Sequence, residues 1–251
     1  MKAPTRRIAT VALRLLAALP AFAAETGSAE KPIAVQMYTL RNAGTLDQQL
    51  KIVHDAGVHA VETVGTQNVS AAELKQLLDK YGIKAISSHT ALADLRNDLD
   101  KVVAFNRAIG NTTLVVPYLD SKDRPKDAAG WAALGRELGG ISERVRAKGM
   151  RLAYHNHDFE LVDFDGRTAL ELLFEAAGPD LQTELDLAWV ARPGHDPAVR
   201  LGQFRTRLSA VPAKDTPPHA EAEAAARSPA LGPAAPHRDA IPAPAAAVRG
   251  H

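Results

Sequence analysis

The stretch GMRLAYHNHDFE, residues 149–160, joins a short apolar run to a cluster of polar side chains that can take part in chemistry. Its first five residues have the apolar character of a buried strand, so the histidines fall where a strand ends in a loop. If that end stays extended, His155 and His157 project to one face and Asn156 to the other. Two imidazoles with a carboxylate three residues on, at Glu160, are able to hold a divalent cation or to move protons near neutral pH. The structural alternative is a pair of histidines that only hydrogen-bond to neighbouring loops, and this stretch alone does not separate the two.

Outward from this strand, apolar runs of strand length alternate with runs of helix length. Strands are expected at residues 33–38, 58–64, 83–86, 112–116, 149–153, 181–187 and 210–213. Helices are expected at residues 46–56, 94–109, 128–147, 167–177 and 197–208, with another that begins at the capping pattern Ser70 to Glu73. This alternation is typical of βαβ units around a parallel sheet, and no Gly-rich phosphate-binding loop follows the first strand. We therefore expect an α/β fold of the TIM (β/α) barrel type, with about seven βα units and the eighth missing.

The two ends of the chain differ in composition from the expected barrel at residues 32–215. Residues 1–23 combine basic residues, an apolar run and a small-residue cleavage pattern, which predicts a signal peptide. Residues 24–31 would form a flexible leader of a periplasmic or secreted protein without a stable membrane anchor. Residues 216–251 are mostly alanine and proline and are expected to form a disordered tail. We favour a frame change in a GC-rich gene over a functional tail as the origin of that segment.

The charge of the chain is balanced. Its 30 Lys and Arg residues and 29 Asp and Glu residues give a formal net charge of +1, and no basic stripe with interleaved aromatic residues occurs. Binding to nucleic acid depends on neutralising phosphates, so this composition favours a small molecule as the partner. The chain has no cysteine, which excludes disulfides, thiolate metal sites and cysteine nucleophiles.

The potentially reactive side chains fall at the carboxyl ends of the expected strands, which a barrel brings together in one mouth. They are Glu62, His89, His155, His157, Glu160, Glu184, Asp186, Lys214 and Asp215. A divalent cation among them could polarise a sugar carbonyl, and a carboxylate or histidine beside it would act as a general base. Inward carboxylates such as Asp186 usually indicate a functional site, whereas Glu62 and Lys214 could equally form salt bridges at the rim.

Several motifs in this order resemble the sugar phosphate isomerase/epimerase family, whose fold is the xylose isomerase-like TIM barrel. The matching residues are Val35 to Arg41, Ser88 with His89, Tyr154 to Glu160, Glu184 to Trp189, and Lys214 with Asp215. The resemblance covers Pro32 to about Asp215. Each motif is modest by itself, but their order and spacing together are specific.

The resemblance implies a divalent metal cation held by strands five to eight, manganese first, with magnesium, cobalt or zinc as alternatives. Carried over to this sequence, it assigns His155 and Asp186 to the metal, with Glu160 as the other strand-five candidate. It implies that Glu160 and His157 are catalytic. The residues that it implies for substrate binding are Glu62, His89 and Lys214.

The chain departs from the family pattern after the sixth strand. Similar proteins carry His-x-Lys-Asp at strand seven, and the first of these positions is Pro212 here, which cannot bind a metal. The glutamate of strand eight has no counterpart in the segment rich in alanine and proline. Two of the four implied metal ligands are therefore missing from the sequence.

The sequence as a whole predicts a sugar isomerase or epimerase that uses a divalent metal and proton transfer next to a carbonyl. A catalytically inactive copy that only binds sugar is the first alternative. A DNA-repair enzyme of the AP endonuclease type is less favoured, because of the balanced charge. Seven units leave an open edge between the first and seventh strands, which predicts edge pairing and leaves a homo-oligomer possible.

Overall fold

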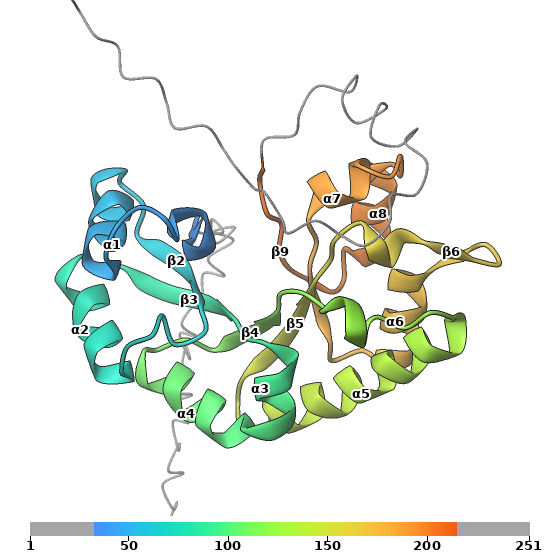
Figure 1. Ribbon diagram of the computed structural model, residues 1–251, viewed down its shortest axis with the longest axis horizontal. Helices are drawn as coiled ribbons and strands as arrows, with labels where there is room; N and C mark the ends of the chain where they lie inside the picture. The colour runs from blue at the N-terminus through green and yellow to red at the C-terminus, as the bar shows by residue number, and fades with distance from the viewer. Residues whose placement is uncertain (1–32, 215–251) are drawn as a thin grey trace, which may run out of the picture. The chain divides into compact units, whose positions relative to one another are not determined.

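The main sheet is built from seven parallel strands that follow one another in chain order. The structure, a computed structural model, describes residues 33–214. Within this range the strand order is β1-β2-β3-β4-β5-β8-β9, and every neighbouring pair is parallel (Figure 1). The strands are β1 Val35–Gln36, β2 Ala60–Val64, β3 Lys84–His89, β4 Thr113–Val116, β5 Arg151–His155, β8 Gln182–Glu184 and β9 Leu208–Ala210.

This strand order distinguishes the two folds that a βαβ rhythm allows. A doubly wound sheet reverses its strand order at a switch point, whereas a barrel adds each new strand beside the previous one. The seven described strands are added in one direction without a reversal. The expected α/β fold of the TIM barrel type, with seven βα units, is therefore confirmed.

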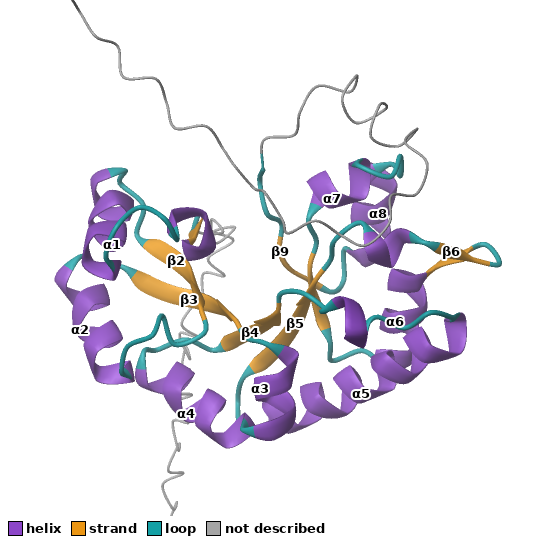
Figure 2. Cartoon of the chain, in the orientation of Figure 1, coloured by secondary structure: helices purple, strands orange, loops and turns teal. Residues whose placement is uncertain are grey.

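Helices cover one face of the sheet (Figure 2). They are α1 Leu46–Asp55, α2 Ala71–Lys80, α3 Leu92–Asn97, α4 Leu99–Ala108, α5 Ala128–Ala147, α6 Ala169–Ala177, α7 Leu187–Ala191 and α8 Pro197–Phe204. Short 3-10 turns lie at η1 Met37–Leu40, η2 Ser121–Asp123 and η3 Phe159–Leu161, and a small antiparallel hairpin pairs β6 Asp163–Phe164 with β7 Arg167–Thr168.

Side-chain caps define where several helices begin. The hydroxyls of Thr45 and Thr168 accept the backbone N–H three residues on, and the side chain found there, Gln48 or Glu171, accepts the N–H of the threonine in return. Ser70 accepts the N–H of Glu73, as its capping pattern predicted. Such caps satisfy backbone donors that have no partner inside the helix, and each contributes about 1 kcal/mol.

The hydrophobic core lies between the sheet and the helices in two clusters. The larger cluster joins β4 and β5 to α5 and α6, and the smaller one joins β2 to α1 and α2. Fully buried members of the two clusters are Leu114, Leu138, Leu152, Leu170, Leu173, Val61, Leu50 and Leu74. Burying a side chain of this kind contributes about 1.5–3 kcal/mol, so this face of the sheet carries most of the stability of the fold.

The structure corrects several of the expected boundaries. The helix expected at 94–109 is two helices separated at Asp98, whose φ of −137° and ψ of 37° lie outside the helical region. The strand expected at 181–187 ends at Glu184, because Asp186 caps the next helix instead of extending the strand. The seventh strand occupies Leu208–Ala210 rather than 210–213. The helix expected at 128–147 is confirmed without change.

The predicted signal peptide at 1–23, the leader at 24–31 and the tail at 216–251 lie outside the described residues and stay predictions. Among the helices of residues 33–214, none is both long enough and apolar enough to cross a membrane.

Two glycines allow α5 to approach α6 closely. A Cβ added to Gly135 would run into the carbonyl oxygen of Leu173, and a Cβ added to Gly139 would run into that of Ala177. These carbonyls belong to the backbone of α6, which cannot move aside as the tip of a flexible side chain can. The next residue of α5, Gly140, is exposed and has no atom within 4 Å of an added Cβ.

We predict opposite effects of alanine at two adjacent positions of α5. Gly139→Ala should lower the free energy of unfolding by about 1–3 kcal/mol, because the methyl group overpacks the contact with α6. Gly140→Ala should raise it by up to about 1 kcal/mol, because alanine favours the helix and the site is open. Urea unfolding of the two variants measures both effects, and equal stabilisation by both would show that α5 and α6 are not in close contact.

Candidate active site

The carboxyl end of β5 turns its side chains alternately toward the helices and away from them. Tyr154 belongs to the helix-side core, so its neighbour His155 points to the opposite face of the sheet. His155 lies in register with Glu184 at the end of β8, which is the neighbouring strand. An imidazole and a carboxylate are therefore brought together by strand register alone.

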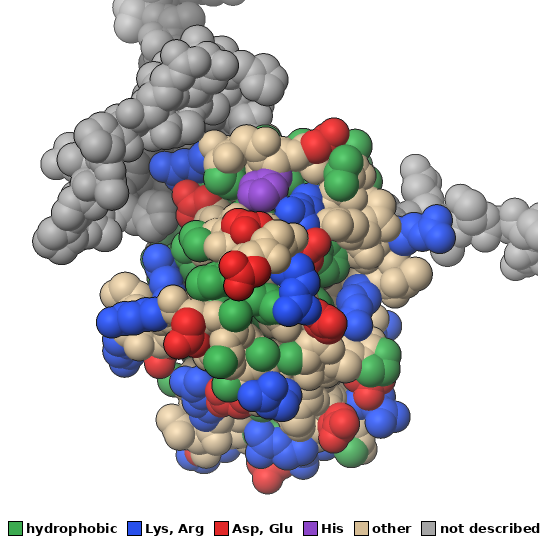
Figure 3. Space-filling view, turned by 90° about the vertical axis from the view of Figure 1, so that its right-hand side faces the viewer, with side chains coloured by type: hydrophobic (Ala, Val, Ile, Leu, Met, Phe, Trp, Pro, Cys, Tyr) green, Lys and Arg blue, Asp and Glu red, His purple; other side chains and the backbone are tan. Residues whose placement is uncertain are grey.

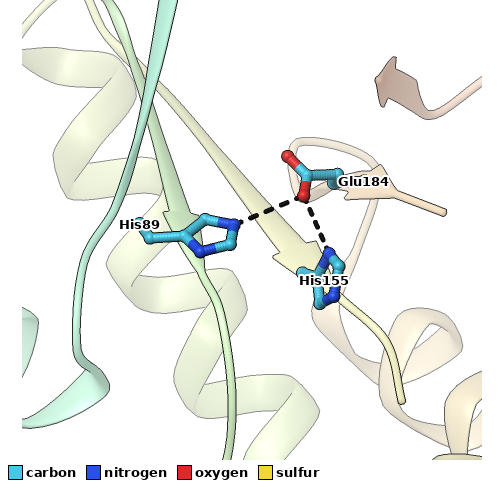
Figure 4. A group of neighbouring side chains, drawn as sticks. All are labelled: His89, His155 and Glu184. Atoms are coloured by element: carbon cyan, nitrogen blue, oxygen red, sulfur yellow. Dashed lines mark hydrogen bonds and ion pairs between the residues drawn. The ribbon is translucent and has the colours of Figure 1, made fainter. Parts of the chain in front are cut away.

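Four side chains form a continuous chain of contacts across this face. Nδ1 of His155 lies 2.8 Å from Oε1 of Glu184, and Nε2 of His89 lies 3.3 Å from the same oxygen. Nε2 of His89 also lies 2.8 Å from Oε1 of Glu62. Figure 4 shows Glu184 between the two imidazoles. Carboxylates and imidazoles thus alternate from β2 through β3 and β8 to β5, and the four residues are 2–8% exposed.

Glu62 is fixed in place by two further donors. The hydroxyl of Ser87 donates to Oε2 of Glu62 at 2.7 Å, and the amide Nε2 of Gln36 donates to Oε1 at 2.9 Å. The amide nitrogen of Gln36 also lies 3.4 Å from Nε2 of His89. Both carboxylate oxygens are therefore held, and Oε1 stays turned toward His89.

The buried contacts shift the protonation of this cluster. Burial alone would lower the pKa of His89, but its hydrogen bonds to Glu184 and Glu62 outweigh burial and raise the pKa to about 9. Burial alone would raise the pKa of Glu184, but the hydrogen bonds from His155 and His89 hold its pKa well below the ordinary value. Glu184 is therefore ionised and can only accept, so the Nδ1 atom of His155 carries the proton in their hydrogen bond.

Asp186 lies fully buried beside this chain, and its two oxygens have different partners. Oδ1 accepts the backbone N–H groups of Ala188 and Trp189 at 3.0 and 3.2 Å, which caps α7. Oδ2 lies 2.6 Å from Nζ of Lys214 and 3.7 Å from Nε2 of His155. The carboxylate is thus fixed in orientation by the helix and turns its second oxygen toward the site.

Asn156 holds the ends of β5 and β8 together. Its Oδ1 accepts the backbone N–H of Asp186 at 2.8 Å, and its Nδ2 donates to the carbonyl oxygen of Asp186 at 3.3 Å. Asn156 is fully buried, so both bonds form away from water. The side chain between the two histidines therefore positions Asp186.

His157 lies in an aromatic cluster next to His155. The centroid of its ring lies 5.0 Å from those of His155, Tyr118 and Trp189, and it stacks on Phe159 at 5.7 Å. The guanidinium of Arg124 lies over Phe159 at 3.6 Å from the ring centroid. His157, Phe159 and Trp189 are half-buried and Tyr118 is exposed, so these rings offer an apolar wall beside the polar chain.

Glu160 occupies a different environment from the other acidic residues of the site. It is fully buried, and it accepts the hydroxyl of Tyr154 at 2.6 Å and the backbone N–H of His157 at 2.9 Å. Burial raises the pKa of Glu160 to about 7, although both hydrogen bonds act in the opposite direction. Because Tyr154 faces the helix side, these contacts tie Glu160 to that side and to the backbone of His157.

The structure therefore brings together most of the predicted site residues. Glu62, His89, His155, Asp186 and Lys214 form one connected group, His157 adjoins it through ring contacts, and Glu160 lies apart. The roles proposed for these side chains stay predictions.

Three further residues contact this group, and the sequence analysis assigned no function to them. Glu184 lies at its centre, and its signal was the position two residues before Asp186 at the same strand end. Gln36 and Ser87 also stand near strand ends, but nothing in the sequence shows that both donate to Glu62.

The chain matches a known protein family and a curated relative in sequence. The profile of the xylose isomerase-like TIM barrel family matches residues 50–240. The rhizopine catabolism protein MocC of Rhizobium meliloti is 26% identical over 190 residues, which cover 68% of this chain and 57% of that protein. The chain thus spans less than two thirds of the length of this curated relative.

Solved structures with the same fold are also similar. A sugar phosphate isomerase/epimerase from Parabacteroides distasonis has a TM-score of 0.63 and 19% identity, covering 77% of this chain and 78% of that one. An AP endonuclease of family 2 from Brucella melitensis has a TM-score of 0.58 and 12% identity, covering 72% and 78%. At these identities the likeness shows the fold.

We predict that Glu160 makes stability depend on pH. Its pKa of about 7 in the folded chain exceeds the ordinary value of 4.5. Its contribution to stability is therefore fully present below pH 4.5 and is lost as the pH rises through about 7. The free energy of unfolding should fall over this range by about 3 kcal/mol relative to that of Glu160→Gln. Glu143→Gln, at an exposed position of α5, is the control, and equal pH profiles for wild type and Glu160→Gln would contradict the prediction.

Proposed function

The chain belongs to the xylose isomerase-like TIM barrel family, and from that premise we propose that it is a sugar isomerase or epimerase. In this proposal it acts on a sugar or sugar derivative by transferring a proton next to a carbonyl, with the help of a divalent metal cation. The observation that carries the proposal is the buried chain from Glu62 through His89 and Glu184 to His155. Burying carboxylates and imidazoles is costly unless they are paired, and clusters of this kind concentrate at functional sites.

The donor atoms around His155 fit a divalent cation. Its two ring nitrogens face different carboxylates, Nδ1 toward Glu184 and Nε2 toward Asp186. Imidazole nitrogens with carboxylate oxygens suit manganese, cobalt and zinc, whereas magnesium prefers oxygen ligands throughout. His155 and Asp186 are the predicted ligands. A bound cation would polarise the sugar carbonyl and acidify the proton on the adjacent carbon.

The acid and base groups of the chain can then move that proton. Glu62 can act as the general base, because its Oε1 can accept the proton from the substrate carbon and return it, and Nε2 of His89 lies 2.8 Å from this oxygen. Gln36 and Ser87 keep Glu62 oriented for this exchange. The ammonium of Lys214, which lies close to the buried Asp186, can donate a hydrogen bond to a sugar oxygen.

The predicted catalytic residues His157 and Glu160 take complementary places in this proposal. The ring of His157 stands next to that of His155 and can touch the substrate. Glu160 accepts the backbone N–H of His157, so its contacts support a positioning role for the loop that carries this histidine. The rings of Tyr118 and Trp189 near His157 offer an apolar surface to the C–H face of a sugar.

A catalytically inactive copy that only binds sugar is the second candidate. It is favoured by Pro212, which stands where similar proteins carry a metal-binding histidine. The endonuclease alternative has less support, because the formal net charge is +1 and basic side chains lie among acidic ones on the face in Figure 3. We also propose export to the periplasm or medium, on the composition of residues 1–23, and pairing of chains along the sheet edges.

The proposed activity predicts exchange of a substrate proton with solvent. A panel of aldoses, ketoses and their phosphates is incubated in D2O with the protein and Mn²⁺ and is followed by NMR. At least one sugar should gain deuterium at the carbon next to its carbonyl, and His155→Ala should slow this exchange by about 100-fold or more.

The control for this experiment is His54→Gln, because Nδ1 of His54 lies 3.0 Å from the carbonyl oxygen of Tyr81, outside the site. Its exchange rate should match that of wild type. Sugar binding without deuterium exchange throughout the panel would favour the inactive copy.

A further inference from the structure

The described residues offer a divalent cation two positions, one on each side of the His155 ring. We propose that the cation binds at His89, His155 and Glu184, and that Asp186 is instead neutralised by Lys214. This inference rests on the proposed function, because it locates the metal that the reaction needs. It moves the cation from Nε2 of His155, which faces Asp186, to Nδ1, which faces Glu184.

The partners of Asp186 leave it little capacity for a cation. One oxygen is bound by two backbone N–H groups of α7, and the other lies 2.6 Å from the ammonium of Lys214. A cation at that oxygen would have to displace the ammonium of Lys214, which already neutralises the buried carboxylate from a side chain that is 37% exposed. The position is also short of ligands, because Pro212 stands where the family pattern has a histidine.

The alternative position has donors that can exchange a proton for a metal. The ligand atoms of His89, His155 and Glu184 all lie within 4.8 Å of one another. Within residues 33–214, the ion pairs that Glu184 makes are with these two histidines. A cation binds an imidazole only through an unprotonated nitrogen, so binding here would displace to solvent the protons through which Nδ1 of His155 and Nε2 of His89 contact Glu184. Figure 4 shows the three side chains converging from β3, β5 and β8.

The burial and chemistry of these ligands define the class of ion. His155 and Glu184 are each 2% exposed and His89 is 8% exposed, so most of the water around a bound cation would be replaced by the protein. Two imidazole nitrogens with one carboxylate oxygen are typical of Zn²⁺, Co²⁺, Fe²⁺ and Mn²⁺ rather than Mg²⁺ or Ca²⁺. Glu62 lies 2.8 Å from Nε2 of His89 and offers a further carboxylate oxygen. The remaining coordination positions would take the substrate.

Metal titration of single variants tests the assignment. The full chain, freed of metal by a chelator, is titrated with Co²⁺ and Zn²⁺ by calorimetry, and the visible absorption of Co²⁺ reports histidine ligation. His89→Gln and Glu184→Gln should weaken binding by more than the roughly 10 to 100-fold that loss of an outer partner of a ligand costs. Asp186→Asn should change it by less than about threefold, and His54→Gln should leave it unchanged.

A second measurement uses the unaltered chain, in case a variant does not fold. Nitrogen NMR of ¹⁵N-histidine-labelled protein identifies which ring atom takes up Zn²⁺. We expect Nδ1 of His155 and Nε2 of His89 to shift on binding. A shift at Nε2 of His155, with loss of binding in Asp186→Asn, would overturn the inference and leave the proposed function standing. No binding of Co²⁺, Zn²⁺ or Mn²⁺ by any form of the chain would overturn both.

Discussion

The contact of Glu184 with two histidines is the interaction on which the site depends. An ionised carboxylate that is 2% exposed is costly to bury unless a cation or several donors face it. His155 reaches it from the neighbouring strand in register, and His89 reaches it from β3. The contact of His89 with Glu184 requires the sheet to curve, because β4 and β5 lie between their strands. The curvature of the sheet therefore allows these contacts to form, and the contacts in turn stabilise the curved sheet.

The apolar core on the helix side of the sheet offsets the cost of burying charged groups on the other side. The helix-side core joins β4 and β5 to α5 and α6, and close packing at Gly135 and Gly139 fixes how these helices meet. Asn156 links this rigid core to the site, because its side chain hydrogen-bonds the end of β5 to the backbone of Asp186. His155 and Asp186 are thus held by a rigid strand and a capped helix rather than by mobile loops, as a preorganised site requires.

The fold could be predicted from the sequence in more detail than the site. Alternating strands and helices with turn signals at their ends are local patterns, so the α/β barrel class and the helix at 128–147 were both correct. Asp98 and Asp186 show where local patterns fail. Asp98 lies within the expected helix, but its backbone conformation is not helical and divides that helix in two. Asp186 lies within the expected strand, but its side chain caps the next helix. The predicted strand ends identified the acidic residues and histidines of the site. Which of these side chains contact one another depends on the register between strands, which the sequence does not show. The family resemblance implied Asp186 as the metal carboxylate, and nothing in the sequence revealed that Lys214 would pair with Asp186 or that Glu184 would contact two histidines.

The absence of a histidine at Pro212 fits a site that has shifted within the barrel mouth. The donors on β3, β5 and β8 form a compact group of their own, so the two family ligands missing from the sequence do not by themselves remove a candidate cation site. X-ray absorption spectroscopy of the chain loaded with one equivalent of Zn²⁺ counts the histidine ligands, because imidazole rings have a characteristic scattering pattern. We expect two imidazoles and a carboxylate oxygen in the coordination shell. A shell with a single imidazole, or with water oxygens alone, would contradict this assignment.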